Sequence, residues 1–384
     1  MEIQLKQEQV PVLLITGYLG SGKTTLLNRL LSNKKGIRFA VIVNDIGEVN
    51  IDASLIEKGG IVGNTDDSLV ALQNGCICCT LKMDLVAQLA DLISARRFDY
   101  IVIEASGICE PAPIAQTIST MPALAPQSVR DGLPYVDCIA TVVDSLRMKD
   151  EFEGGSALEK DDIGDDDLER LVIEQLEFCN LVLLNKAAEL TSEELGKLKG
   201  IVKSINPGAK VLECNYGDVD LDELIYTGMF RFDEVATSAA WIAAIEGEDE
   251  EEEEEAEGEA LEYGIDTYVY TRRPALDLNK FDNMVARHWP ANIIRAKGLC
   301  YFSQDRDKCY LFEQAGRQKS LKDCGLWFAT MEADELAEMM ERDRKLREDW
   351  DPEYGDRMQK IVFIGQHLDK PALEKLMDGC LADS

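Results

Sequence analysis

Histidine is nearly absent from this chain: His288 and His367 are the only two among 384 residues. A metal site must therefore rely mainly on cysteine or carboxylate ligands. Basic residues are also scarce, with 40 Lys and Arg against 72 Asp and Glu and a net charge of −32. A surface this negative repels phosphates, so we expect neither a nucleic acid nor an anionic membrane as a partner.

Long apolar runs are missing as well. No run is long enough to cross a bilayer, and residues 1–8 lack the apolar segment of a secretion signal. We therefore expect a cytoplasmic protein. In that compartment the eleven cysteines predict metal ligands, catalytic thiols or core residues rather than disulfides. Cys138, Cys179 and Cys300 lie in apolar contexts that are typical of small buried residues.

The length of the chain favours two domains, because one core rarely holds so many residues. Up to about residue 230, short runs of Val, Ile and Leu alternate with amphipathic segments. This alternation predicts an α/β domain with a mostly parallel sheet covered on both faces. The predicted strands are residues 12–15, 39–43, 100–103, 138–143, 181–184 and 210–213, and the predicted helices between them include residues 25–31, 85–94 and 168–178.

The composition changes near Glu246. Residues 248–255 are eight consecutive acids, and such a block repels itself and stays solvated. We therefore predict a domain at residues 1–232, an acidic linker at 233–262 that is disordered in part, and a C-terminal domain at 263–384. Weak binding of a hard cation or of zinc is the alternative interpretation of the acidic run.

The C-terminal domain is predicted to be smaller and of the α+β class. The pattern indicates strands at 265–270, 293–302, 308–313 and 360–364, and helices at 278–287, 333–345 and 370–377. Up to its last strand this is a β-α-β-β-α-β order, which favours helices on one face of a sheet.

A phosphate-binding motif follows the first predicted strand. Residues 17–24 read Gly-Tyr-Leu-Gly-Ser-Gly-Lys-Thr and match the P-loop pattern G-x-x-x-x-G-K-[ST] at every position. Glycines let successive N–H groups face the phosphate oxygens, and the start of the following helix adds attraction. Lys23 is expected to reach the β- and γ-phosphates, and the Thr24 hydroxyl to bind Mg²⁺. The predicted nucleotide-binding residues of this segment are Gly17, Gly20, Ser21, Gly22, Lys23, Thr24 and Thr25.

Further parts of a nucleotide hydrolase come later in the chain. Glu104 ends a predicted strand, where a carboxylate can hold the water shell of the metal or orient the attacking water, and Gly107 can donate its N–H to the γ-phosphate. Asn185 and Lys186 follow the strand after which GTPases carry their N-K-x-D base-recognition motif. The expected Asp is Ala188 here, and an acid, Glu189, comes only one position later. The sequence therefore leaves guanine selectivity open.

Three cysteines, Cys76, Cys78 and Cys79, lie between the phosphate loop and Glu104. Thiolates this close together suit Zn²⁺ and also Cu(I), and Asn74-Gly75 permits the necessary turn. Three protein ligands would leave one position open, as expected of a transfer site. Metal binding is the favoured interpretation, with a redox dithiol and structural cysteines as the alternatives.

The motifs in this order resemble the CobW/nitrile-hydratase-activator branch of the metal-handling P-loop GTPases, which includes zinc metallochaperones. The resemblance is good from residue 10 to about 230 and looser beyond. It implies that the chain binds GTP with Mg²⁺, holds Zn²⁺ or a related divalent ion at Cys76, Cys78 and Cys79, and delivers the ion to a client metalloprotein contacted through the C-terminal domain. It rests on residues 17–25, 44–48 with Ile51-Asp52, 75–79, 104–107 and Asn185-Lys186.

The resemblance also assigns residues 44–48 as a switch segment, which makes Glu48 a predicted catalytic residue together with Lys23 and Glu104. Three features depart from the family: Asp45 replaces the usual Glu, residues 272–277 lack the usual His, and the loop between the domains is acidic rather than His-rich. A non-hydrolysing nucleotide switch or scaffold is the main alternative, and a kinase is weaker because no Arg-rich lid is apparent. The sequence leaves open whether the chain forms a homodimer.

Overall fold

The computed structural model describes residues 9–43, 82–127, 131–152, 166–232, 265–315, 318–342, 346–347 and 350–382. Contacts divide the chain into two compact units. The first reaches to Ala239, and the second comprises the residues from Ala240 onward together with Asp165–Arg170. Residues 233–264 lie outside the described ranges, so the domain boundaries at 232 and 262 stay predictions.

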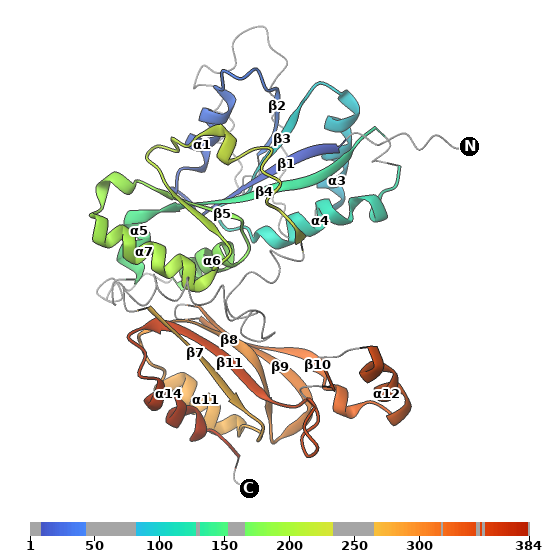
Figure 1. Cartoon of the computed structure of the whole chain (residues 1–384), viewed down its shortest axis with the longest axis vertical. Coiled ribbons are helices and arrows are strands. Elements are labelled where there is room, and N and C mark those ends of the chain that lie inside the picture. The colour runs from blue at the N-terminus through green and yellow to red at the C-terminus, as the bar shows by residue number, and fades with distance from the viewer. Residues whose placement is uncertain are drawn as a thin grey trace. The chain divides into compact units, whose positions relative to one another are not determined.

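The first unit contains a six-stranded sheet in which all paired strands are parallel (Figure 1). The strand order is β2-β3-β1-β4-β5-β6, so the chain places β2 and β3 on one side of β1 and β4 to β6 on the other. Ligands of open α/β sheets bind at such a reversal of strand order. The strands are β1 (Gln9–Thr16), β2 (Phe39–Val43), β3 (Tyr100–Glu104), β4 (Leu133–Asp144), β5 (Leu181–Asn185) and β6 (Lys210–Glu213).

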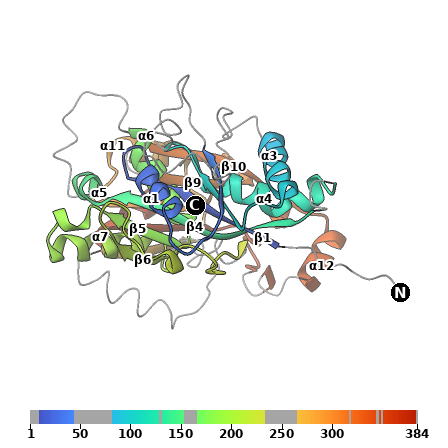
Figure 2. The same ribbon diagram turned by 90° about the horizontal axis from the view of Figure 1, so that it is seen from above.

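Helices cover both faces of this sheet. Leu13 and Ile15 of β1 pack in one cluster with the buried leucines of α1. The alternate residues Val12 and Leu14 are fully buried too, and α4 packs against β1 and β4. Helix α3 packs beside α4, and α5 beside α7 (Figure 1, Figure 2). The helices of this unit are α1 (Lys23–Leu31), α3 (Lys82–Ala95), α4 (Pro111–Leu124), α5 (Ser145–Phe152) and α7 (Ser192–Ile205), together with α6 (Asp166–Glu177) from Leu171 onward.

The second unit contains a five-stranded antiparallel sheet in the order β10-β9-β8-β11-β7. Helices α11 and α14 pack on it, and Phe281, Met284, Leu373 and Met377 from these helices share one core cluster with strand residues such as Phe363. The elements are β7 (Ile265–Arg272), α11 (Leu278–Arg287), β8 (Ile293–Phe302), β9 (Asp305–Ala315), β10 (Gln318–Leu326), α12 (Ala333–Arg342), β11 (Gln359–Gln366) and α14 (Lys370–Asp378).

The predicted fold class is confirmed: a mostly parallel α/β unit is joined to a smaller α+β unit. Two details of the second unit were wrong. Strand β10 was not predicted, and α12 does not help to cover the sheet, since none of its described residues is buried. Among the residues that the structure describes, no helix is long and apolar enough to cross a membrane.

Candidate nucleotide-binding site

Three strand ends meet at one edge of the first sheet. Strands β3 and β4 flank β1 and run parallel to it, so the segments that follow these strands leave the same edge. Strand β5 pairs with β4 and ends there as well. The phosphate loop (residues 17–24), residues 105–107 and Lys186 follow β1, β3 and β5. The sheet therefore gathers motifs that lie far apart in the sequence.

The phosphate loop has a backbone that favours glycine at three positions. Gly17, Gly20 and Gly22 have φ angles of 130°, 83° and 110°, in a region that other residues rarely adopt. A Cβ atom on Gly17 would lie 2.2 Å from the carbonyl oxygen of Val142, and one on Gly22 would lie 2.3 Å from Nδ2 of Asn185. At Gly17 and Gly22 the loop therefore packs against β4 and β5 without room for a side chain, as a backbone cradle for phosphate requires.

Lys23 and Ser21 are held inside this loop. The side chain of Lys23 is mostly buried, and its Nζ donates a hydrogen bond to the carbonyl oxygen of Tyr18 at 3.1 Å. The same carbonyl accepts the N–H of Ser21 at 3.2 Å. The buried Ser21 Oγ has no hydrogen-bond partner among the described residues. A buried hydroxyl without a partner is costly, so this atom fits an added oxygen ligand such as a phosphate.

Thr24 and Glu104 bring two oxygen groups together at the loop. Thr24 Oγ1 donates a hydrogen bond to Glu104 Oε1 at 3.0 Å. Glu104 ends β3, where its backbone pairs with Ile15 of β1 and Val43 of β2, and it is only 2% exposed. A hydroxyl and a buried carboxylate are the ligand types that Mg²⁺ prefers in proteins. These residues fit the metal that a nucleotide would bring.

The segment after β3 touches the phosphate loop. A Cβ atom on Gly107 would lie 2.7 Å from the backbone nitrogen of Leu19, so this glycine is needed for the close approach. The predicted N–H donation from Gly107 to a phosphate is compatible with this position and stays a prediction. Thr25, the third residue of α1, is exposed.

Asn185 joins the phosphate loop to the segment after β6. Its Nδ2 donates to the carbonyl oxygen of Ser21 at 2.8 Å, and its Oδ1 accepts the N–H of Gly217 at 3.2 Å. Cys214 Sγ lies 3.6 Å from the same oxygen, and burial raises the pKa of this thiol to about 11. The residue is buried, so its amide braces the site from within; contact with a base stays a prediction.

Lys186 forms an ion pair with Asp144, the last residue of β4. The Lys186 backbone is left-handed, with φ 63°. The main chain of Asp144 accepts the Tyr18 hydroxyl at 3.2 Å, and the Arg147 guanidinium lies 5.1 Å from the centre of the Tyr18 ring. Asp144 was missed from the sequence, although it ends a buried strand with a carboxylate as Glu104 does.

The altered base motif forms a short 3₁₀ turn, Ala187–Glu189. Ala188 and Glu189 are both exposed. The N–H of Ala188 donates to Oδ1 of Asn215 at 2.8 Å. The turn that replaces the expected acid is thus tied to the segment after β6, a connection that the sequence alone did not indicate.

Several predicted site residues lie outside the described residues: the switch segment at 44–48 with Glu48, Ile51-Asp52, and the cysteine loop with Cys76, Cys78 and Cys79. Among the residues that the structure does describe, no group of three or more His, Cys, Asp and Glu side chains could hold a metal ion. Cys138, Cys179 and Cys300 are buried, as predicted. The zinc site therefore stays a prediction from the sequence.

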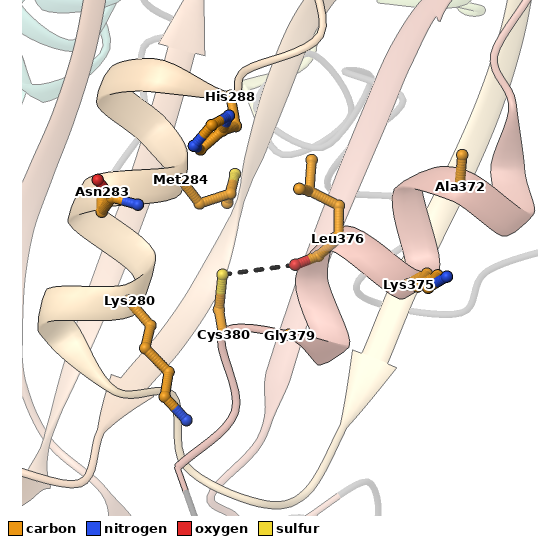
Figure 3. Close-up of a pocket in the computed structure, with 9 residues that line it drawn as sticks. All are labelled: Lys280, Asn283, Met284, His288, Ala372, Lys375, Leu376, Gly379 and Cys380. Atoms are coloured by element: carbon orange, nitrogen blue, oxygen red, sulfur yellow. Dashed lines mark hydrogen bonds between the residues drawn. The ribbon is translucent and has the colours of Figure 1, made fainter.

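A pocket of about 510 Å³ lies in the second unit, between α11 and α14 (Figure 3). The pocket is lined by Lys280 of α11, by His288 immediately after that helix and by Lys375 of α14, and Cys380 lines it as well. Cys380 Sγ donates to the carbonyl oxygen of Leu376 at 3.5 Å, and burial raises the pKa of this thiol to about 11. A neutral thiol beside two lysines is a poor metal ligand, so this pocket is no substitute for the cysteine loop.

The parallel sheet, the glycine cradle and the Thr24–Glu104 contact define a P-loop nucleotide-binding protein. A family model described as "CobW/HypB/UreG, nucleotide-binding domain" matches residues 11–213, and one described as "Cobalamin synthesis protein cobW C-terminal domain" matches residues 265–381. The chain belongs to the CobW/HypB/UreG family of P-loop GTPases. The resemblance inferred from the motifs is thereby confirmed.

Curated relatives agree with this assignment. The chain is similar to "Zinc-regulated GTPase metalloprotein activator 1" of Dictyostelium discoideum, with 32% identity over 97% of this chain and 80% of that protein. It is also similar to "Zinc chaperone CobW" of Pseudomonas aeruginosa, with 33% identity over 56% of this chain and 60% of that one. Among solved structures, Zn(II)-bound YjiA GTPase from E. coli matches 98% of this chain and 100% of its own, at 21% identity and a TM-score of 0.42. The sequence relatives, rather than this structural likeness, carry the assignment.

Proposed function

We propose that this chain is a GTP-dependent zinc chaperone. It binds GTP with Mg²⁺ at the phosphate loop, hydrolyses the GTP, and passes Zn²⁺ from the cysteine loop to a client metalloprotein. The observation that carries the nucleotide part is the placement of Lys23, Thr24 and Glu104 around a loop that has no room for a side chain at Gly17 and Gly22. The names of the relatives support the zinc part.

Each residue has a defined part in this proposal. Lys23 exchanges the Tyr18 carbonyl for the β- and γ-phosphate oxygens, and Thr24 and Glu104 hold Mg²⁺, which neutralises phosphate charge when it is bound. Glu104 also orients the attacking water, and the Gly107 N–H stabilises charge on the γ-phosphate. Glu48 in the switch segment is a further catalytic residue.

The metal is the cargo of this cycle rather than a resident cofactor. Cys76, Cys78 and Cys79 supply three thiolates, which suit Zn²⁺ and leave a fourth position for a ligand of the client. GTP orders the switch segment and the cysteine loop together, and hydrolysis releases that order so that the ion can leave. The client binds the C-terminal unit. A cytoplasmic location stays a prediction, and homodimer formation stays open.

A zinc titration tests the metal part. With GTP and Mg²⁺ present, the full chain should bind one Zn²⁺ more than the Cys76/Cys78/Cys79→Ser triple variant. Cys324→Ser is the matched control, because Cys324 is an exposed cysteine of the second unit, and it should keep the wild-type stoichiometry. An unchanged stoichiometry in the triple variant would sink the proposed zinc site.

A non-hydrolysing nucleotide switch is the second candidate, favoured by the exposed Ala188 in place of the acid that reads guanine. Phosphate release from GTP and from ATP separates the two candidates. The zinc chaperone proposal predicts release from GTP well above background and its loss in Lys23→Ala. If the wild type binds GTP but releases phosphate only at the background rate, the result would instead favour the non-hydrolysing nucleotide switch.

A further inference from the structure

Tyr216 is an exposed aromatic residue held in an unfavourable backbone conformation. It follows β6, its side chain is 76% exposed, and its φ angle is 54°. For a residue with a large side chain the left-handed region costs on the order of 1–2 kcal/mol. Such a conformation persists only where the surroundings hold it, and it is often found where a side chain must be presented for function.

Both neighbours of Tyr216 are fixed to the nucleotide site. Asn215 Oδ1 accepts the N–H of Ala188 at 2.8 Å, and the N–H of Gly217 donates to Asn185 Oδ1 at 3.2 Å. The carbonyl oxygen of Tyr216 itself accepts Arg29 Nε, from α1, at 2.7 Å. These bonds hold the Tyr216 backbone between the altered base motif and the helix that follows the phosphate loop.

A second tyrosine shows what an ordinary partly exposed ring does in this fold. Tyr226 has the same φ angle of 54°, but its ring packs against Tyr100 with centroids 5.1 Å apart. Its hydroxyl donates to the carbonyl oxygen of Asp99 at 3.4 Å. Within the described part of the chain, the Tyr216 ring makes no such ring contact or hydroxyl hydrogen bond. Packing of the Tyr216 ring inside the described part of the protein therefore does not offset the free-energy cost of its left-handed backbone conformation.

We infer that the Tyr216 ring stacks on the nucleobase and forms one wall of the base site. This rests on the proposed nucleotide binding and adds a residue to it. A base lying beside residues 185–188 would cover apolar ring surface that is otherwise in water. Stacking on an aromatic side chain is tolerant of base identity, because every base has a π-face. Tyr216 thus supplies affinity that the loss of the acid at Ala188 does not remove.

Two variants separate the ring from the backbone. Tyr216→Asn removes the ring while keeping a residue that tolerates the left-handed region, and Tyr216→Phe keeps the ring without the hydroxyl. Calorimetric binding with Mg²⁺ is measured for GTP, ATP and inorganic tripolyphosphate, which has no base. Tyr216→Asn should weaken GTP and ATP by the same factor, about 5- to 150-fold, and leave tripolyphosphate unchanged, whereas Tyr216→Phe should stay within about twofold of wild type.

Three results would overturn the inference. The first is wild-type GTP affinity in Tyr216→Asn, and the second is an equal loss for tripolyphosphate, which would mean that the variant disturbs the phosphate loop. A loss for GTP alone would also overturn it, because it would indicate hydrogen bonding rather than stacking. Lys23→Ala keeps this test distinct from that of the proposed function. If the wild type binds no nucleotide, or Lys23→Ala binds it unchanged, the proposed function fails; if only the Tyr216 results fail, the stacking fails alone.

Discussion

Replacing Asn185 with alanine should both destabilise the first unit and weaken nucleotide binding. The Asn185 amide makes two hydrogen bonds with backbone groups, to the carbonyl oxygen of Ser21 at 2.8 Å and from the N–H of Gly217 at 3.2 Å, and its Oδ1 also accepts Cys214 Sγ at 3.6 Å. Alanine leaves both buried backbone groups without a partner, at roughly 1–3 kcal/mol each. Because water can enter the space of the lost amide, we take the lower half of that range and expect about 3 kcal/mol in total.

The effect on binding follows from the position of Ser21. Its carbonyl is held by Asn185, and its backbone is part of the phosphate cradle, so the loop loses its fixed geometry. Small displacements of positioned groups are costly, and we expect nucleotide affinity to fall by about tenfold or more. A change of this size would appear with tripolyphosphate as well as with GTP.

Asn180 provides a matched control immediately before β5. It is also buried; its Oδ1 accepts the N–H of Ile139 at 3.1 Å, and its Nδ2 donates to the carbonyl oxygen of Met229 at 3.1 Å. Asn180→Ala therefore removes the same two kinds of hydrogen bond away from the phosphate loop. It should destabilise the first unit by a similar amount and leave nucleotide affinity unchanged.

The assay must report on the first unit. All four tryptophans, at 241, 289, 327 and 350, belong to the second unit, so tryptophan fluorescence would follow the wrong part of the chain. Hydrogen exchange of β1 and β5 peptides, read by mass spectrometry over a urea series, gives the stability instead. Equal affinity losses for Asn185→Ala and Asn180→Ala would refute the reasoning, as would an unchanged stability in Asn185→Ala.

Three further outcomes can be measured. Gly17→Ala should abolish nucleotide binding, since its Cβ would lie 2.2 Å from the Val142 carbonyl oxygen. Gly20→Ala has nothing within 4 Å of its Cβ and should cost only about 1 kcal/mol of backbone strain. Equal effects of the two variants on nucleotide binding would contradict this. Burial would raise the pKa of Glu313, but its ion pairs, Lys297 first, hold it at about 2. The ionised Glu313 contributes about 3 kcal/mol to the free energy of unfolding above pH 4.5, and this contribution is lost as the pH falls toward 2. Glu313→Gln should flatten that part of the pH profile of stability, measured by urea unfolding followed by tryptophan fluorescence. An unchanged profile would count against the ion pairs. Exposed Cys324 should react with iodoacetamide at pH 8 at least about a hundredfold faster than Cys309, because burial raises the pKa of Cys309 to about 12. Peptide mass spectrometry after short pulses of reagent measures the two rates, and similar rates would show that Cys309 is not buried.

The first sheet could be predicted because most of its strands are buried on both faces. Strands β2, β3 and β5 are buried at all five of their positions, so their sequences are continuous apolar runs that stand out from the neighbouring helices. Predicted bounds for β2 and β6 agree with the structure. Those of β1 and β4 were too short at both ends, where the missed residues include exposed Gln9 and the buried polar residues Thr16 and Asp137.

The missed elements lacked such a pattern. Among the described residues, β10 pairs with β9 alone and is an edge strand, and its mostly exposed residues include charged ones that protect an edge from further pairing. Helix α4 contains Pro113 and Pro122, which hid its periodicity. Helix α7 did offer a signal: Thr191 and Glu194 form a capping box that marks its start.

In the site, too, residues that form a local pattern could be predicted, and residues that meet only through the fold could not. The phosphate loop was predicted because its residues are contiguous. The ion pair of Lys186 with Asp144 and the hydrogen bond of Ala188 to Asn215 join residues 42 and 27 positions apart. Their meeting depends on the order β4-β5-β6, which no local pattern contains.

Strand β3 has a consequence for motion. Its last residue, Glu104, pairs through the backbone with both Ile15 and Val43, so β3 cannot slide without breaking ladders on both sides. A strand packed in this way moves only together with the strands on both sides of it. Any response to the state of the nucleotide must then occur in the segments that leave the sheet, while Glu104 stays at a fixed position against which those segments rearrange.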